Sequence, residues 1–112
     1  MEEFAYRLAE AGCDMVIGSH PHVLQRFELW QGTPVCYSLG NFCFGGHSGP
    51  DDMDSVIVRQ TVLRTADGFA LGETSFLPCS ISSVSDKNDF RPTLYEAESP
   101  AAVRVMEKLG LS

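Results

Sequence analysis

Two histidines, His20 and His22, stand two positions apart after a short apolar segment, and their imidazoles could bind a metal ion. Side chains at positions i and i+2 of an extended backbone point to the same side, so both rings can face one cleft. Pro21 disfavours the α region for His20, which favours this extended backbone. The spacing therefore predicts a pair of metal ligands, and a polar loop stacked on the end of a sheet is the alternative.

The segments before the histidines predict part of an α/β fold. Residues 1–11 predict a helix, because apolar residues recur at helical spacing and Gly12 can close its end. Residues 15–17 predict a strand that is apolar on both faces, as in a buried parallel sheet. In open α/β sheets, ligands bind beyond the carboxyl ends of the strands. His20 and His22 stand in that place.

Two β-hairpins and a second helix are expected after the histidines. The first hairpin pairs residues 24–29 with 34–39, and the second runs from Asp54 to Leu77 around an Asp-Gly turn. Ser99 and Pro100 predict a helix start, with a capping side chain followed by a proline in the first turn. The side chains expected to face the core from this helix are Ala102, Val103, Met106 and Leu109.

The short strand at residues 15–17 needs parallel neighbours, which normally precede it with their own crossover helices. Here the sequence starts at the helix itself. Either other strands of this chain cover the strand, or a second chain does, or the chain is the C-terminal part of a longer protein. Since uncovered sheet edges and apolar faces are usually buried by another chain, we also expect a homodimer formed through the long hairpin or the terminal helices.

Length and composition indicate a single globular domain, or part of one. The 112 residues suffice for one core, and the 44% hydrophobic and 21% charged content is ordinary. No stretch approaches the ~20 apolar residues of a membrane span. The net charge of −7 and the scattered basic residues argue against a nucleic-acid partner. The four cysteines lack a C-x-x-C pattern and are expected to be reduced and mostly buried, with a disulfide or a zinc site as alternatives.

Three motifs carry a family resemblance. They are G-C-D-M-V-I-G-S-H-P-H-V-L-Q from Gly12, Y-S-L-G-N-F from Tyr37 and N-D-F-R-P from Asn88. In this order they resemble the C-terminal portion of the bacterial capsule-synthesis CapA (PGA_cap) family, poly-γ-glutamate biosynthesis proteins of the calcineurin-like metallophosphoesterase superfamily. The resemblance implies that residues 1–112 form the C-terminal part of a four-layer α/β/β/α sandwich with a dinuclear metal site.

The resemblance also implies roles for the histidines. In the superfamily a G-H-x-H-like motif supplies two ligands, and His20 and His22 stand at those positions, with Ser19 inserted relative to the simplest form. The metal would be a divalent ion of the Mn, Fe or Zn class in the complete domain. The other ligand motifs of the superfamily, Asp-x-His, Gly-Asp and Gly-Asn-His, have no counterpart in a comparable context. We therefore assign no catalytic residue and expect the isolated chain to be inactive and to hold metal weakly. CapA-like proteins are often membrane-associated or extracytoplasmic, and the sequence leaves the localisation of this chain open.

Asn41 and Arg91 are candidate substrate-binding residues. Asn41 ends a strand beside the expected cleft, so it could bind a phosphate, a carboxylate or a ligand histidine, or it could satisfy the turn at Gly40. Arg91 could pair with an acidic ligand, or with Asp86 or Asp89.

The loop before the second hairpin is rich in glycine and in acidic residues. His47 with Asp51, Asp52 and Asp54 could form a hard-cation site, but solvated acids on a glycine-rich loop are the expected interpretation. Two functions are left. The chain is a segment of a metal-dependent phosphoesterase-type protein, or it is a non-catalytic dimeric binding or assembly module with vestigial histidines, which the missing acidic ligands favour for the isolated chain.

Overall fold

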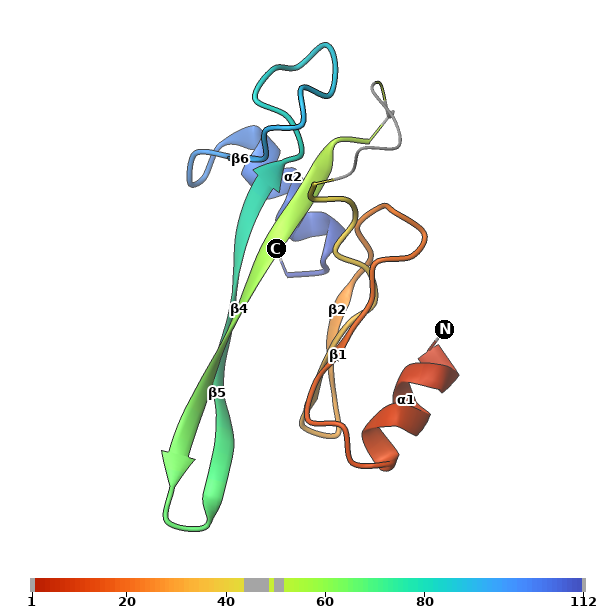
Figure 1. The fold of residues 1–112 in the computed structure, drawn as a ribbon, viewed down its shortest axis with the longest axis vertical. Coiled ribbons are helices and arrows are strands. Elements are labelled where there is room, and N and C mark those ends of the chain that lie inside the picture. The colour runs from red at the N-terminus through yellow and green to blue at the C-terminus, as the bar shows by residue number, and fades with distance from the viewer. Residues whose placement is uncertain (1, 44–48, 50–51, 112) are drawn as a thin grey trace.

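The protein is a mixed α/β chain with two small sheets and two helices in its described part (Figure 1). The structure is a computed structural model that describes residues 2–43, 49 and 52–111. The elements, in chain order, are α1 (Glu2–Glu10), β1 (Val16–Ile17), β2 (Phe27–Trp30), β3 (Thr33–Cys36), β4 (Asp54–Thr65), β5 (Gly68–Ser80), β6 (Thr93–Leu94) and α2 (Pro100–Lys108). The two expected hairpins and both expected helices are confirmed.

The first sheet has the strand order β1-β3-β2 and places β1 against a strand of its own chain. Val16 pairs with Val35 in parallel register, and β2 pairs with β3 as an antiparallel hairpin. Gln31 and Gly32 form the hairpin turn, and both have positive φ, as a two-residue turn of the I′ type requires. Other strands of this sequence therefore cover one edge of β1, the first of the three explanations above.

Helix α1 covers the first sheet through a small apolar cluster. Ala5 packs with Val35 and Tyr37, and Tyr6 stacks on Trp30 with ring centroids 4.4 Å apart. The buried face of α1 therefore fixes it beside the strands that precede and follow the histidines.

The second sheet is dominated by the long hairpin of β4 and β5, and β6 adds two residues beside the end of β5. The pairing runs from Asp54 opposite Ser80 to Thr65 opposite Gly68, with a register shift between Gln60 and Val62. The turn end of this hairpin extends away from the rest of the chain (Figure 1). Residues 61–71, here called the hairpin arm, are all exposed. The exposed apolar side chains of the arm include Val62, Leu63, Phe69 and Leu71.

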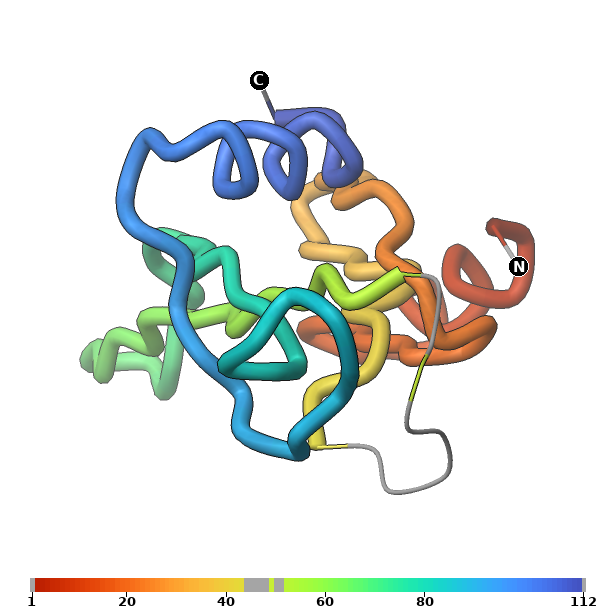
Figure 2. Tube along the Cα trace, turned by 90° about the horizontal axis from the view of Figure 1, so that it is seen from above, coloured from red at the N-terminus to blue at the C-terminus, as the bar shows by residue number. Residues whose placement is uncertain are grey.

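Helix α2 lies across the base of the long hairpin, beside the segment that leads into β2 (Figure 2). Val105 and Leu109 pack there with Leu24 and Val56 in a shared buried cluster. The helix starts as expected, because the Ser99 hydroxyl accepts a hydrogen bond from the Ala102 N–H at 3.1 Å.

One of the core positions expected in α2 is wrong. Val103 is 43% exposed, whereas Val105 is fully buried. The helix presents positions 102, 105, 106 and 109 to the core, which is a stripe at i, i+3, i+4 and i+7, and Val103 lies on its flank. The short strand contacts of this small domain set that rotation, and they are not visible in the helix sequence itself.

The described helices and cysteines test two further expectations. Within the described ranges, no helix has both the length and the apolar character needed to cross a membrane. All four cysteines are free thiols, of which Cys36 and Cys79 are buried while Cys13 and Cys43 are exposed. The expectation of reduced thiols is confirmed, although only two of them are buried.

Candidate functional site

The two histidines lie in a tight turn that follows β1. The His22 N–H donates to the Ser19 carbonyl oxygen at 2.8 Å, the peptide bond between His20 and Pro21 is cis, and the φ of His22 is +75°. The expectation of an extended backbone is therefore wrong, because this turn reverses the chain within four residues. The turn still brings both exposed imidazoles together, with ring centroids 5.8 Å apart and ring planes at 76°.

Asn41 contacts His22 directly. Its side-chain oxygen Oδ1 lies 2.9 Å from His22 Nδ1, and Asn41 is 9% exposed. A carboxamide oxygen can only accept a hydrogen bond, so with this amide orientation the imidazole donates from Nδ1 and carries its lone pair on Nε2. Ligand histidines in metal sites use this arrangement, in which one nitrogen donates to an oxygen and the other binds the metal.

Gly18 lets the backbone before the turn approach β3 closely. Its N–H donates to the Cys36 carbonyl oxygen at 2.8 Å, and its own carbonyl oxygen accepts from the Leu39 N–H at 2.9 Å. A Cβ at position 18 would overlap the Tyr37 carbonyl oxygen. Only glycine fits this position without moving one backbone segment away from the other.

Gly40 makes a second close approach, next to Asn41. Its φ is +72°, and a Cβ at this position would lie 3.2 Å from the Asp54 carbonyl oxygen. The Ser55 hydroxyl donates to the Leu39 carbonyl oxygen at 3.0 Å, and Leu39 forms a bridge with Leu24. The segment that carries Asn41 is therefore held between the start of β4 and the residues after His22.

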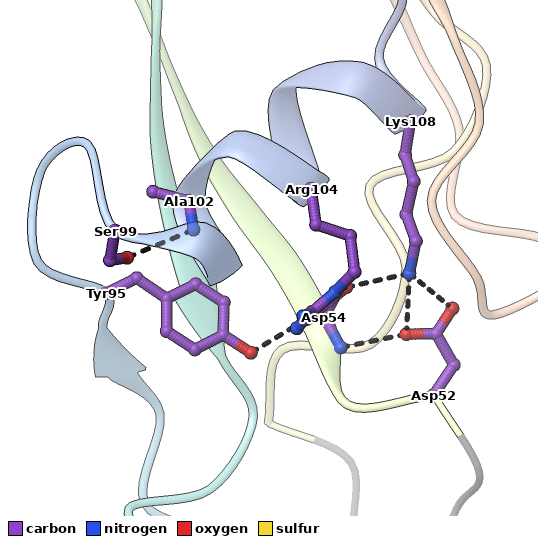
Figure 3. Close-up of polar contacts among 7 residues, drawn as sticks. All are labelled: Asp52, Asp54, Tyr95, Ser99, Ala102, Arg104 and Lys108. Atoms are coloured by element: carbon purple, nitrogen blue, oxygen red, sulfur yellow. Dashed lines mark hydrogen bonds and ion pairs between the residues drawn. The ribbon is translucent and has the colours of Figure 1, made fainter.

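Asp54 is the centre of a dense polar cluster at the start of β4 (Figure 3). Its carboxylate is 4% exposed and accepts bonds of 2.7 Å from Arg104 Nε and Nη2, from Lys108 Nζ and from the Tyr95 hydroxyl. Burial alone would raise the pKa of this carboxyl, but the hydrogen bonds from Arg104, Lys108 and Tyr95 outweigh it and hold the pKa well below its usual range.

The expectation of solvated acids in the loop is wrong for Asp54. Arg104 and Lys108 stand four positions apart on one face of α2, and this spacing is the sequence signal for a paired anion. Lys108 also contacts Asp52 at 3.1 Å. A cavity of about 890 Å³ opens beside the cluster. His47 and Asp51, the remaining members of the weighed cation site, lie outside the described residues.

The structure does not bring Arg91 to the histidines through any contact among the described residues. Its side chain is exposed, and its backbone N–H donates to Asp89 Oδ1 at 3.1 Å. Within the same described ranges, no group of three or more His, Cys, Asp or Glu side chains gathers as a metal site. The candidate site that the chain provides is thus His20, His22 and Asn41.

Comparisons with known proteins bear on this site. The family model described as "Bacterial capsule synthesis protein PGA_cap" matches residues 1–46, a range that contains all three site residues. The PGA biosynthesis protein CapA of Bacillus subtilis is 48% identical over 66 residues, which are 59% of this chain and 17% of that protein. The chain belongs to the CapA family.

Two further relatives extend the CapA match along the chain. The capsule biosynthesis protein CapA of Bacillus anthracis is 34% identical over 91 residues, 78% of this chain and 22% of that protein. An uncharacterised protein of Sinorhizobium fredii is 40% identical over 99 residues, 86% of this chain and 21% of that protein. The chain thus spans about a fifth of the length of the curated relatives it matches. No solved structure matches it.

Proposed function

We propose that this CapA-family chain supplies two histidine ligands, His20 and His22, to the metal site of a phosphoesterase-type domain in capsule or poly-γ-glutamate synthesis. The main support is the hydrogen bond between His22 Nδ1 and Asn41, because it leaves the Nε2 lone pair as the ligand. Two imidazoles bound at about 2.0–2.1 Å to one tetrahedral ion have ring centroids roughly 5 Å apart. The observed 5.8 Å fits such an ion after a small adjustment.

The chain's own residues would hold and orient the metal. A bound divalent ion of the Mn, Fe or Zn class would polarise a phosphoryl oxygen and lower the pKa of a bound water. His20 and His22 would bind the ion, and Asn41 would keep His22 in the required tautomer. We further propose that the two sheets, flanked by α1 and α2, form part of a four-layer sandwich in a longer CapA protein, whose other regions would supply the acidic ligands.

Zinc titration of the 112-residue chain tests the ligand assignment. We expect weak binding of one ion, a loss of at least about tenfold in affinity for His20→Ala and for His22→Ala, and a loss of about tenfold for Asn41→Ala, because outer-shell partners contribute 10–100-fold. His47→Ala is the matched control, and Cys13→Ser with Cys43→Ser removes the exposed thiols from every variant. Wild-type zinc affinity in both His20→Ala and His22→Ala would exclude the assignment.

A specific feature favours a second function, a dimeric binding or assembly module. Val62 pairs with Leu71 across the hairpin arm, and Phe69 lies beside them opposite Arg64. These apolar side chains are exposed, and the outer edge of β4 pairs with no other described strand. We propose that a second copy of the chain covers the arm, since unpaired edges and apolar patches are sites of association.

Sedimentation at micromolar concentration tests the dimer. We expect a dimer that buries more than ~1,000 Å², and we expect Phe69→Lys with Leu71→Lys to weaken it by at least about tenfold, since charge would enter an apolar contact. Val103→Lys, at an exposed apolar position outside the arm, should leave the dimer intact. A folded wild-type monomer under these conditions would rule out this association.

A further inference from the structure

We infer that Asp54 is a positioning residue for His22, acting through Gly40 and Asn41, so that the docking of α2 helps to set which imidazole nitrogen of His22 carries the proton. The inference rests on the proposed function for its biological meaning, since the tautomer matters when His22 is a metal ligand. Its physical basis is a continuous series of contacts between the polar cluster and the imidazole.

The first step joins α2 to the start of β4. Arg104 binds both carboxylate oxygens of Asp54, and Lys108 binds one of them (Figure 3). A bidentate arginine fixes the carboxylate in the guanidinium plane, and the burial of Asp54 shields these bonds from solvent. The first residues of β4 are therefore held in one place relative to the helix.

The second step passes from β4 to the segment that carries Asn41. The Asp54 carbonyl oxygen lies against the α-carbon side of Gly40, where even a Cβ would come within 3.2 Å. The next residue, Ser55, is fully buried and donates to the Leu39 carbonyl oxygen. Backbone and side chain of β4 thus confine Leu39 and Gly40 from one side, while the bridge to Leu24 confines them from the other.

The third step is the hydrogen bond from His22 to Asn41. Asn41 follows Gly40 directly, so a shift of Asp54 would move the carboxamide that accepts the imidazole proton. A neutral imidazole without that acceptor distributes its proton between Nδ1 and Nε2. One hydrogen bond biases this equilibrium about two- to tenfold. Loss of the Asp54 contacts is therefore expected to lower the Nδ1–H fraction of His22 without any direct contact between the two side chains.

Nitrogen-15 NMR of the histidine-labelled chain tests this series of contacts. Spectra taken about two pH units above the reference imidazole pKa of ~6.5 report the tautomer of each neutral ring. We expect Nδ1–H to predominate for His22 in the wild type, and its ratio to Nε2–H to fall about two- to tenfold in Asn41→Ala and in Asp54→Asn. Glu3→Gln, which breaks an exposed ion pair with Arg7, should leave the ratio unchanged.

Several readouts keep the outcome decisive. The amide spectrum shows whether Asp54→Asn is folded, and if it is not, Arg104→Lys replaces it, because lysine keeps the charge but loses the bidentate contact. A folded variant with the wild-type His22 ratio overturns the inference. So does an equal change at His20, which would indicate general loosening of the turn. Zinc titration is scored separately: a tautomer that follows Asp54 in a chain without zinc affinity would reject the proposed function and keep this inference.

Discussion

Replacing Asp54 with alanine is expected to lower the free energy of unfolding by about 2–4 kcal/mol. Removing one partner of a buried ion pair typically costs 3–5 kcal/mol, because the remaining charges lose their hydrogen bonds, and the half-exposed Arg104 reduces this figure since water can reach it. Lys108 and the Tyr95 hydroxyl would lose the same acceptor. Urea unfolding followed by circular dichroism measures the change.

The matched control for Asp54 is Glu3, which pairs with Arg7 four positions along the exposed face of α1. Glu3→Ala should change the free energy of unfolding by no more than about 0.5 kcal/mol, as for other exposed helix pairs. If Asp54→Ala costs no more than Glu3→Ala, the cluster does not anchor α2.

The same carboxylate predicts how stability depends on pH. The folded-state pKa of Asp54 lies below its ordinary value of 3.8, so its contribution is present above that value and is lost as the pH falls from it toward the folded-state pKa. Urea midpoints should therefore decline below about pH 4 in the wild type. They should decline less steeply in Asp54→Asn. Some slope should persist, since hydrogen bonds from Ser83 lower the pKa of Asp89 to about 2.

Gly18→Ala is expected to destabilise the chain by about 3 kcal/mol or more, at the upper end of the cost of overpacking. The new Cβ would overlap the Tyr37 carbonyl oxygen, and backbone cannot rotate away as a side chain can. Gly18 is also bonded on both sides, to Cys36 and to Leu39, so relief of the overlap must separate β1 from β3. Urea unfolding gives the magnitude, and zinc titration shows whether the histidine turn moves with β1.

Gly49→Ala is the control for Gly18, because a Cβ at position 49 meets no atom within 4 Å. It should leave the free energy of unfolding within about 0.5 kcal/mol of the wild type. Equal stability of Gly18→Ala and Gly49→Ala would show that β1 and β3 are not packed as closely as described.

Locally encoded features of the fold could be predicted from the sequence. The Ser99 cap, the Pro100 start of α2 and the turn that ends β4 depend on neighbouring residues alone, and the structure has all three. The parallel pairing of Val16 with Val35 joins distant segments across an intervening strand, so no local pattern specifies it. Tertiary contacts therefore decided what periodicity left open.

The candidate site divides along the same line. His20 and His22 were found from their spacing, although the predicted backbone between them was wrong, because the turn from Ser19 reverses the chain before the spacing rule can act. Asn41 had several equal interpretations, and only its position against His22 selects the histidine contact. The partners of Asp54 lie 50 positions away in the sequence, where no motif connects them.

The long hairpin and the docking of α2 differ in how far along the chain their partners lie. Pairs in the hairpin meet around a two-residue turn, so each new pair extends an existing ladder at low entropic cost. The bonds from Arg104 to Asp54 close a loop of 50 residues and gain nothing until that whole loop is ordered. The hairpin can therefore form early and alone, whereas α2 joins last. In the native state the same order runs backwards, and transient opening begins with release of this C-terminal helix.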